Sequence, residues 1–246
     1  RVQSGWTEAI RTALDGGDLD EAVLDRNVRL ILDVVFRSLT ANDHSRTDAP
    51  DLPANARHAR QAAADGVVLL KNASATLPMS ANARVAAFGT GSYDFIAGGV
   101  GSGDVNEAYT VSLVEGLEAR GIRLDATLSE MYATYETEEK AKLPKKRMFF
   151  ELAPSIPEMP LSEQCLERAV AGNDLAMITL SRDSGEFQDR SLEGDFYLTL
   201  AEQTMIDEVS RAFRAVGKPV VMVINSGNVI EVASWEVKVD AIVLPW

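Results

Sequence analysis

Cysteine and histidine are scarce in this sequence. Its 246 residues include one cysteine, Cys165, and two histidines, His44 and His58. A lone cysteine forms no disulfide within the chain, and three such side chains are too few for the usual closed zinc site. We therefore expect no metal centre, no thiol redox chemistry and no cofactor.

Basic residues and long apolar runs are also in short supply. The sequence has 24 lysines and arginines against 37 aspartates and glutamates, a formal net charge of −13. Phosphate backbones are bound by basic faces, so we expect no nucleic-acid partner. No apolar run approaches the roughly 20 residues of a membrane-spanning helix, so we expect no membrane partner either.

The overall composition is that of a globular protein. Hydrophobic residues make up 46% and charged residues 25% of the chain, which argues against a disordered or fibrous class. The sequence begins with RVQSGW, which lacks an initiator methionine and a signal peptide, and it ends on the strand-like VDAIVLPW. We therefore expect an incomplete chain, an internal piece of a longer protein. The lone cysteine and the missing signal favour a cytoplasmic location.

The first 55 residues predict two helices followed by a linker. The second helix has an apolar face with three- and four-residue spacing, made of Leu24, Val28, Ile31, Leu32, Val35 and Leu39. Asp18 or Asp20 is placed to cap its start. Residues 41–55 are polar and contain proline, which indicates a linker. We interpret residues 1–40 as the end of a preceding domain.

From residue 56 onward, strand patterns alternate with helix patterns. The predicted strands are rich in valine, isoleucine and leucine and occupy residues 84–89, 122–128, 175–181, 220–225 and 241–246. Amphipathic helices lie between them, and two of these end at Gly121 and Gly217. Continuous apolar strands separated by helices are typical of a mostly parallel sheet with helices on both faces. We therefore assign residues 56–246 to an α/β sandwich domain.

Residues 130–160 interrupt this alternation and predict an insertion. The segment contains a basic cluster of Lys140, Lys142, Lys145, Lys146 and Arg147. We interpret the cluster as a solvated surface rather than an anion site, because the chain as a whole is acidic. Phe149 and Phe150 are candidates for packing against a neighbouring domain.

The ligand crevice of a parallel sheet lies beyond the carboxyl ends of its strands, and the most charged loop there is SRDSGEFQDRSLEGDF. A carboxylate held by arginine stays ionised, whereas an unpaired carboxyl in a cleft can act as a general acid. We therefore expect Asp189 to pair with Arg190 or Arg182 and organise the loop, and Glu186 to be the free acid. A solvated charged loop is the alternative, and spacing alone favours it.

The second candidate is the glycine-rich loop FGTGSYDFIAGGVGSGDV, residues 88–105. Its glycines allow close approach of the backbone to a ligand, and Ser102 is placed to donate to an oxygen. A dinucleotide or phosphate site is disfavoured, since the spacing does not fit GxGxxG and no lysine precedes a serine or threonine. We favour a polar, uncharged ligand, with a plain long connection as the alternative.

Two weaker signals follow other strands. Lys71 comes after the apolar run GVVLL, which we expect to be buried, and we interpret it as a charge at a strand end. Residues 225–228, NSGN, follow a strand and predict a turn formed by Asx hydrogen bonds.

Five segments in order resemble glycoside hydrolase family 3, the β-glucosidase and β-xylosidase type. They are DGVVLLKNASATLPM, RVAAFG, GGVGSGDV, LSRDSGEFQDRSLEGDFYLT and KPVVMVINSGNVIEVASW with VDAIVLPW. The similarity extends from about Asp65 to Trp246, and AIRTALDGGDLDEAVLDRNVRLILDVV resembles the last helices of the family's (β/α)8 barrel. The resemblance implies a retaining glycosidase whose active site lies between that barrel and an (α/β)6 sandwich.

The resemblance also implies roles for individual residues. Glu186 in SGEFQDR stands where the family has its acid/base glutamate, and Asp189 and Arg190 match the pair that shapes the loop. Ser102 in GSG matches a loop that approaches the sugar bound at the cleavage point. Phe187 stands where the family usually has glycine, which predicts a reshaped aglycone side.

A retaining mechanism needs two carboxyl groups about 5–5.5 Å apart. The resemblance places the nucleophile, an aspartate, on the barrel and therefore before Arg1. We expect a carbohydrate substrate, a β-glucoside or a similar sugar, with the barrel domain of the same protein as partner, and an inactive isolated chain. One alternative is a non-catalytic α/β sandwich that serves as a binding or structural module. Another is a nucleotide-binding protein, which the spacing of the glycine-rich loop disfavours.

Overall fold

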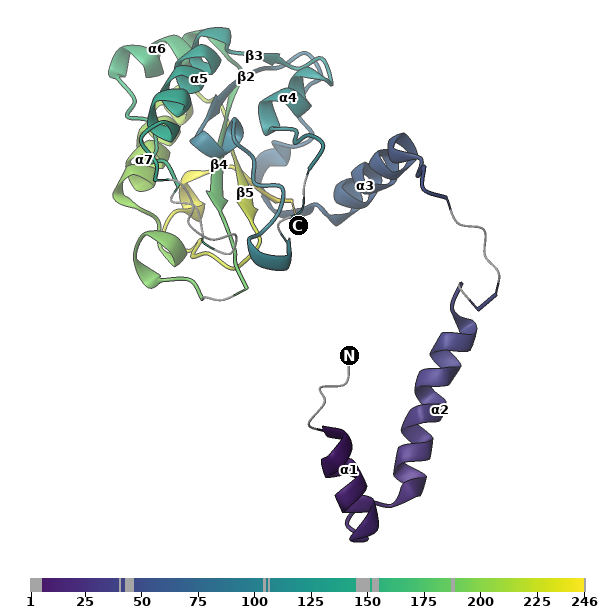
Figure 1. Ribbon diagram of the computed structural model, residues 1–246. Coiled ribbons are helices and arrows are strands. Elements are labelled where there is room, and N and C mark those ends of the chain that lie inside the picture. Colours follow the sequence, from purple (N-terminus) through teal and green to yellow (C-terminus); the bar gives the residue numbers. More distant parts are fainter. Residues whose placement is uncertain are drawn as a thin grey trace. The chain divides into compact units, whose positions relative to one another are not determined.

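The computed structural model divides into two compact units, Arg1–Asn55 and Ala56–Trp246 (Figure 1). The described residues are 6–39, 41–42, 47–103, 105, 107–144, 151, 155–186 and 189–245. His44 and Trp246, both named above, lie outside them.

The first unit contains the two predicted helices, α1 (Trp6–Asp15) and α2 (Glu21–Arg37). Asp20 caps α2 by accepting a hydrogen bond from the backbone N of Ala22 at 2.9 Å, which confirms one of the two predicted caps. Most of the predicted apolar face is solvent-exposed, with Ile31 at 64%, and Leu24 is half-buried. A contiguous exposed apolar face is typical of a surface that packs against other protein. The interpretation of residues 1–40 as the end of a preceding domain stays a prediction.

Helix α3 (Leu52–Gly66) begins inside the predicted linker. The side chain of Asp51 accepts a hydrogen bond from the backbone N of Ala54 at 2.9 Å and so caps the first turn. Pro53 lies in that turn, where a helix needs no N–H donor. The proline and the polar residues of this segment predicted a linker up to residue 55. A proline is also compatible with the first turn of a helix, and α3 begins at Leu52.

The second unit is built on a six-stranded sheet of order β1-β6-β5-β4-β2-β3. The strands are β1 (Val68–Asn72), β2 (Arg84–Phe88), β3 (Arg123–Leu124), β4 (Leu175–Arg182), β5 (Val220–Ser226) and β6 (Ala241–Leu244). All neighbours are parallel except β1, which pairs with β6 in antiparallel fashion. The predicted mostly parallel α/β fold is confirmed.

Helices cover both faces of the sheet (Figure 1). On one face, α5 (Ala126–Lys140), α6 (Glu163–Gly172) and α7 (Leu200–Arg214) enclose the main core, which includes Phe88, Ile178 and Phe213, all 0% exposed. Successive residues of a strand point to opposite faces of the sheet. Ala86 of β2 therefore lies in the main core, and its neighbour Val85 lies in a second, smaller core on the other face. Leu77 and residues of α4 (Leu113–Glu118) pack there.

The predicted strand over residues 122–128 is wrong beyond its first residues. Only Arg123–Leu124 forms β3, because the side chain of Asp125 accepts a hydrogen bond from the backbone N of Leu128 at 3.0 Å and caps α5. Apolar residues at 122, 124 and 128 fit either structure, and only the cap decides between them.

The predicted insertion is also partly wrong, because α5 extends to Lys140 and buries Tyr132 completely. Within the basic cluster, Lys140 binds Asp94 at 2.8 Å, and Lys142 binds Glu139 at 2.5 Å. The rest of the cluster and both phenylalanines lie outside the described residues, namely Lys145, Lys146, Arg147, Phe149 and Phe150.

The apolar run before Lys71 is not buried, contrary to expectation. Val68, Leu69 and Leu70 are 45–52% exposed, and β1 is an edge strand whose described neighbour in the sheet is β6. Lys71 itself donates to Glu236 Oε2 at 3.0 Å and to the carbonyl O of Glu236 at 2.6 Å. Its interpretation as a structural charge at a strand end is confirmed.

Gly89 ends β2 with φ of 86°, and an added Cβ would clash with the carbonyl O of Thr179 on β4. We expect Gly89→Ala to lower the free energy of unfolding by about 2–4 kcal/mol, since left-handed strain and overpacking add. Urea unfolding measures this change. Gly172→Ala is the matched control, because no atom lies within 4 Å of a Cβ there. Equal effects of the two substitutions would contradict the prediction.

Candidate functional site

The loops that follow β2, β4 and β5 contact one another at the carboxyl edge of the sheet. The backbone N of Val100 donates to the carbonyl O of Ser184 at 2.8 Å, and Val100 and Gly185 form an isolated parallel bridge. The hydroxyls of Ser92 and Thr179 are 2.7 Å apart. The glycine-rich loop and the acidic loop, which the sequence presents as separate candidates, therefore form one assembly.

Asn225, at the end of β5, connects this strand to the glycine-rich loop. Its Oδ1 accepts from the backbone N of Ile96 at 2.7 Å, and its Nδ2 donates to the carbonyl O of Ile96 at 3.0 Å. The predicted turn is formed by its neighbours instead, since Ser226 Oγ donates to the carbonyl O of Asn228 at 2.6 Å. Nothing in the spacing of NSGN signals a partner 129 residues away.

Glu186 is exposed in the loop after β4 and lies directly against Gly101. A Cβ added to Gly101 would meet Glu186 Cδ and Oε2 at 3.0 Å, and Gly101 has φ of 86°. A glycine is therefore required for the two loops to approach this closely. Ser102 follows Gly101 and is exposed beside the same loop.

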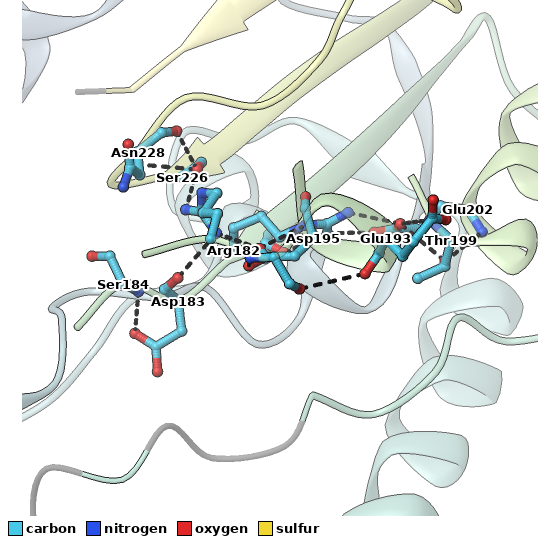
Figure 2. Close-up of polar contacts among 12 residues, drawn as sticks. Arg182, Asp183, Ser184, Glu193, Asp195, Thr199, Glu202, Ser226 and Asn228 are labelled. Atoms are coloured by element: carbon cyan, nitrogen blue, oxygen red, sulfur yellow. Dashed lines mark hydrogen bonds and ion pairs between the residues drawn. The ribbon is translucent and has the colours of Figure 1, made fainter. Parts of the chain in front are cut away.

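The expected pairing of Asp189 with Arg182 or Arg190 is wrong. Arg182 binds Glu202 through two hydrogen bonds, Nη1 to Oε1 at 2.5 Å and Nη2 to Oε2 at 2.8 Å (Figure 2). Arg190 Nη1 binds Asp195 Oδ1 at 2.5 Å. Both arginine side chains are 10% exposed, whereas Asp189 is at the surface. Their counter-charges come from Glu202, which is 6% exposed, and from Asp195, which is 29% exposed.

Arg190 joins both ends of the segment that carries Glu186. Its Nη1 donates to the carbonyl O of Asp183 at 3.3 Å, and its Nη2 donates to Ser226 Oγ on β5 at 3.0 Å. The loop is therefore closed at its base and attached to the neighbouring strand. Phe187, the predicted departure from the family pattern, lies outside the described residues.

Glu202 links the end of β4 to the start of α7. Its Oε2 accepts from the backbone N and the hydroxyl of Thr199 at 2.8 and 2.9 Å, which completes a capping box. The same carboxylate holds Arg182, and its side chain is only 6% exposed. This residue was missed from sequence, although T-x-x-E before an apolar helix is the signal that identifies its capping role.

Glu158 holds the start of the glycine-rich loop. Its Oε2 accepts from the backbone N of Thr90 at 2.9 Å, and its Oε1 accepts from the Thr90 hydroxyl at 3.2 Å. Burial raises the pKa of Glu158 to about 7, with a further contribution from the Glu202 charge, while the bonds from Thr90 lower it. Glu158 lies within the predicted insertion, where no sequence signal identified it.

We expect Glu158→Gln to stabilise the chain more at pH 8 than at pH 5. The pKa of Glu158 is about 7 in the folded state, above its ordinary value of 4.5. The free energy of unfolding therefore falls as the pH rises from 4.5 to about 7, because ionisation is less favourable in the folded state. Glutamine removes this ionisation, and we expect a difference of roughly 1–3 kcal/mol between the two pH values.

Urea unfolding at both pH values measures this difference. Glu167→Gln, an exposed carboxyl on α6, is the control. A pH-independent effect of Glu158→Gln would contradict the assignment.

The described residues include no group of three or more His, Cys, Asp or Glu side chains that could hold a metal ion. No helix among them is both long enough and apolar enough to cross a bilayer. Cys165 is buried on α6, and burial raises the pKa of its thiol. Because the thiolate is the reactive form, we interpret Cys165 as a packing residue.

Comparisons with known proteins identify relatives of this domain. The family model for the glycosyl hydrolase family 3 C-terminal domain matches residues 67–246. Beta-glucosidase A from Butyrivibrio fibrisolvens is 34% identical over 208 residues, which cover 74% of this chain and 24% of that protein. A beta-glucosidase from Ruminococcus albus is 30% identical over 190 residues, 74% of this chain and 19% of that protein.

Solved structures show the same fold. Beta-glucosidase 3B from Thermotoga neapolitana, in complex with glucose, matches with a TM-score of 0.83 and 41% sequence identity. The match covers 97% of this chain and 33% of that one, so the chain spans about a third of its structural relative. The chain belongs to glycosyl hydrolase family 3 and contains the C-terminal domain of that family.

Proposed function

We propose that this chain supplies the acid/base carboxyl of a retaining β-glycosidase of the β-glucosidase type. The relatives named above are β-glucosidases, and this chain spans 24% of the Butyrivibrio fibrisolvens enzyme and 33% of the Thermotoga neapolitana enzyme. The proposal therefore concerns the full-length protein that contains the chain. Its nucleophile is proposed to be an aspartate of a preceding barrel domain.

The position of Glu186 carries the proposal. Its carboxyl is exposed at the carboxyl edge of the sheet, where parallel sheets bind ligands, and it lies against Gly101. The nearby arginines bind Asp195 and Glu202, and no described residue forms an ion pair with Glu186. The carboxyl therefore remains available for proton transfer.

Two successive proton transfers follow from this placement. Glu186 first donates its proton to the leaving glycosidic oxygen while the nucleophile attacks the anomeric carbon. The resulting carboxylate then removes a proton from the water that hydrolyses the glycosyl-enzyme. Ser102, beside Gly101, is proposed to donate a hydrogen bond to a sugar hydroxyl. A glucoside is the proposed substrate class because the Thermotoga neapolitana structure contains glucose.

The stereochemical course of hydrolysis tests the proposal. The full-length protein is mixed with p-nitrophenyl β-glucoside, and the anomer released first is identified by proton NMR. We expect β-glucose first, because two inversions retain the configuration. Release of α-glucose first, or no hydrolysis of any aryl β-glycoside, would contradict the proposal.

The isolated chain provides a further prediction. We expect no turnover of the aryl β-glucoside by residues 1–246. The proposed acid/base Glu186 is in this chain, whereas the proposed nucleophile is in the barrel domain, and a retaining mechanism needs both carboxyl groups. Spectrophotometric release of p-nitrophenol measures this. Turnover comparable to that of the full-length protein would show that the nucleophile lies within this chain.

A further inference from the structure

We infer that Asp195 is a positioning residue for Glu186 and that it acts through Arg190. The inference rests on the proposed function of Glu186, and it assigns a task to a carboxylate that takes no part in the proposed proton transfers. Figure 2 shows Asp195, Asp183 and Ser226 among the polar contacts of this region.

The first step is the closure of the loop by Arg190. Glu186 lies between Asp183 and Arg190 in the sequence, and the Arg190 guanidinium donates to the carbonyl O of Asp183 at 3.3 Å. The same guanidinium donates to Ser226 Oγ at 3.0 Å. The two ends of the segment are thereby held together and against β5.

The second step is the control of Arg190 by Asp195. The guanidinium is largely buried, with its side chain 10% exposed, and Asp195 is the carboxylate bound to it, at 2.5 Å. Asp195 Oδ2 also accepts from the backbone N of Ser191 at 3.1 Å. A buried cation without its counter-charge moves toward water, so loss of Asp195 releases Arg190 from Asp183 and Ser226.

Asp195 is itself firmly placed. Its carbonyl O accepts from Arg182 Nε at 2.8 Å, and Arg182 is in turn bound by the buried carboxylate of Glu202. The Asp195 side chain is 29% exposed, so its replacement leaves less unsatisfied polarity than replacement of Glu202, which is 6% exposed. Replacement of Asp195 is therefore expected to loosen the loop with less damage to the fold than replacement of Glu202.

The third step connects the loop to catalysis. General acid catalysis requires the carboxyl to lie within hydrogen-bond reach of the leaving oxygen, and a displacement of about 1 Å can reduce the rate about 10²-fold. Among the described residues, the loop also contacts the glycine-rich loop, through Val100 with Ser184 and Gly185 and through Gly101 with Glu186. Release of the Arg190 contacts is thus expected to misplace Glu186 rather than to unfold the domain.

Substrates with different leaving groups test the inference in the full-length protein. Phenol leaves poorly and needs protonation, whereas 2,4-dinitrophenol leaves without it. We expect Asp195→Asn to lower kcat/KM for phenyl β-glucoside by about 10-fold or more, and for the dinitrophenyl β-glucoside by about twofold or less. A merely structural role would lower both values by the same factor, because only the amount of folded protein would change.

Two further variants keep the test decisive. Ser226→Ala removes one hydrogen-bond acceptor of Arg190 without changing any charge. We expect it to lower kcat/KM for phenyl β-glucoside selectively, by a smaller factor than Asp195→Asn does. It decides the question if Asp195→Asn does not fold. Asp207→Asn is the matched control, because Asp207 pairs with Lys238 at 2.5 Å outside this loop, and both substrates should be unaffected.

The inference is overturned if Asp195→Asn lowers kcat/KM equally on both substrates. If Asp195→Asn does not fold, the inference is overturned when a folded Ser226→Ala shows no selective loss on phenyl β-glucoside. Glu186→Gln, measured in parallel, separates this failure from failure of the proposed function. If Glu186→Gln is selective and Asp195→Asn is not, only the positioning role falls. If Glu186→Gln itself affects neither substrate, the acid/base assignment falls, and the positioning role with it.

Discussion

Glu186→Gln in the full-length protein is expected to lower kcat/KM for phenyl β-glucoside by about 10²–10⁴-fold, the usual contribution of a positioned general acid. Glutamine keeps the shape of the side chain and cannot transfer a proton. For the 2,4-dinitrophenyl β-glucoside, glycosylation needs no acid, so we expect deglycosylation to become rate-limiting and kcat to fall. Steady-state kinetics on both substrates measure the two effects.

Azide provides a second readout for the same variant. As an anion it attacks the glycosyl-enzyme without a general base, so it is expected to restore turnover of the dinitrophenyl substrate and to yield a β-glucosyl azide. Glu193→Gln, an exposed carboxyl on the same loop, is the control and should respond to neither test. Full activity of Glu186→Gln on both substrates would favour the alternative of a non-catalytic module.

Phe213→Ala is expected to lower the free energy of unfolding by about 3–5 kcal/mol. The Phe213 ring is 0% exposed in the main core and packs edge-to-face on Phe88, with ring centroids 6.0 Å apart. Its removal loses the transfer free energy of the ring and leaves a cavity between α7 and the sheet. Urea unfolding of the chain measures the change.

Leu200→Ala is the control for this second prediction. Leu200 begins the same helix but is 78% exposed, so we expect a change within about 0.5 kcal/mol. If the two substitutions cost the same, α7 does not pack on the sheet as described.

The architecture was largely predictable because its signals are local. Runs such as LAMITLS and VVMVIN are mostly apolar, as a strand covered on both faces requires, and both form central strands. The errors occurred where two local structures compete. At residues 122–128 a strand and a helix fit equally well, and the cap by Asp125 decided for the helix.

The candidate site was predictable only in part. The position of Glu186 after β4 follows from strand order and from the general location of ligand sites in parallel sheets. The contacts of Asn225 and Glu158 with the glycine-rich loop were not predictable, since each joins residues far apart in the chain. Their residue types and spacing are equally compatible with surface turns.

By itself, the sequence determined the fold class, the order of its elements and the loop in which a free carboxyl occurs. These properties depend on periodicity, capping and strand composition, which are encoded within short segments. Only the tertiary structure decided that Asp195 and Glu202, rather than Asp189, neutralise the two arginines. Ion pairing depends on distance and burial across separate segments, and neither quantity is contained in the spacing of residues along a chain.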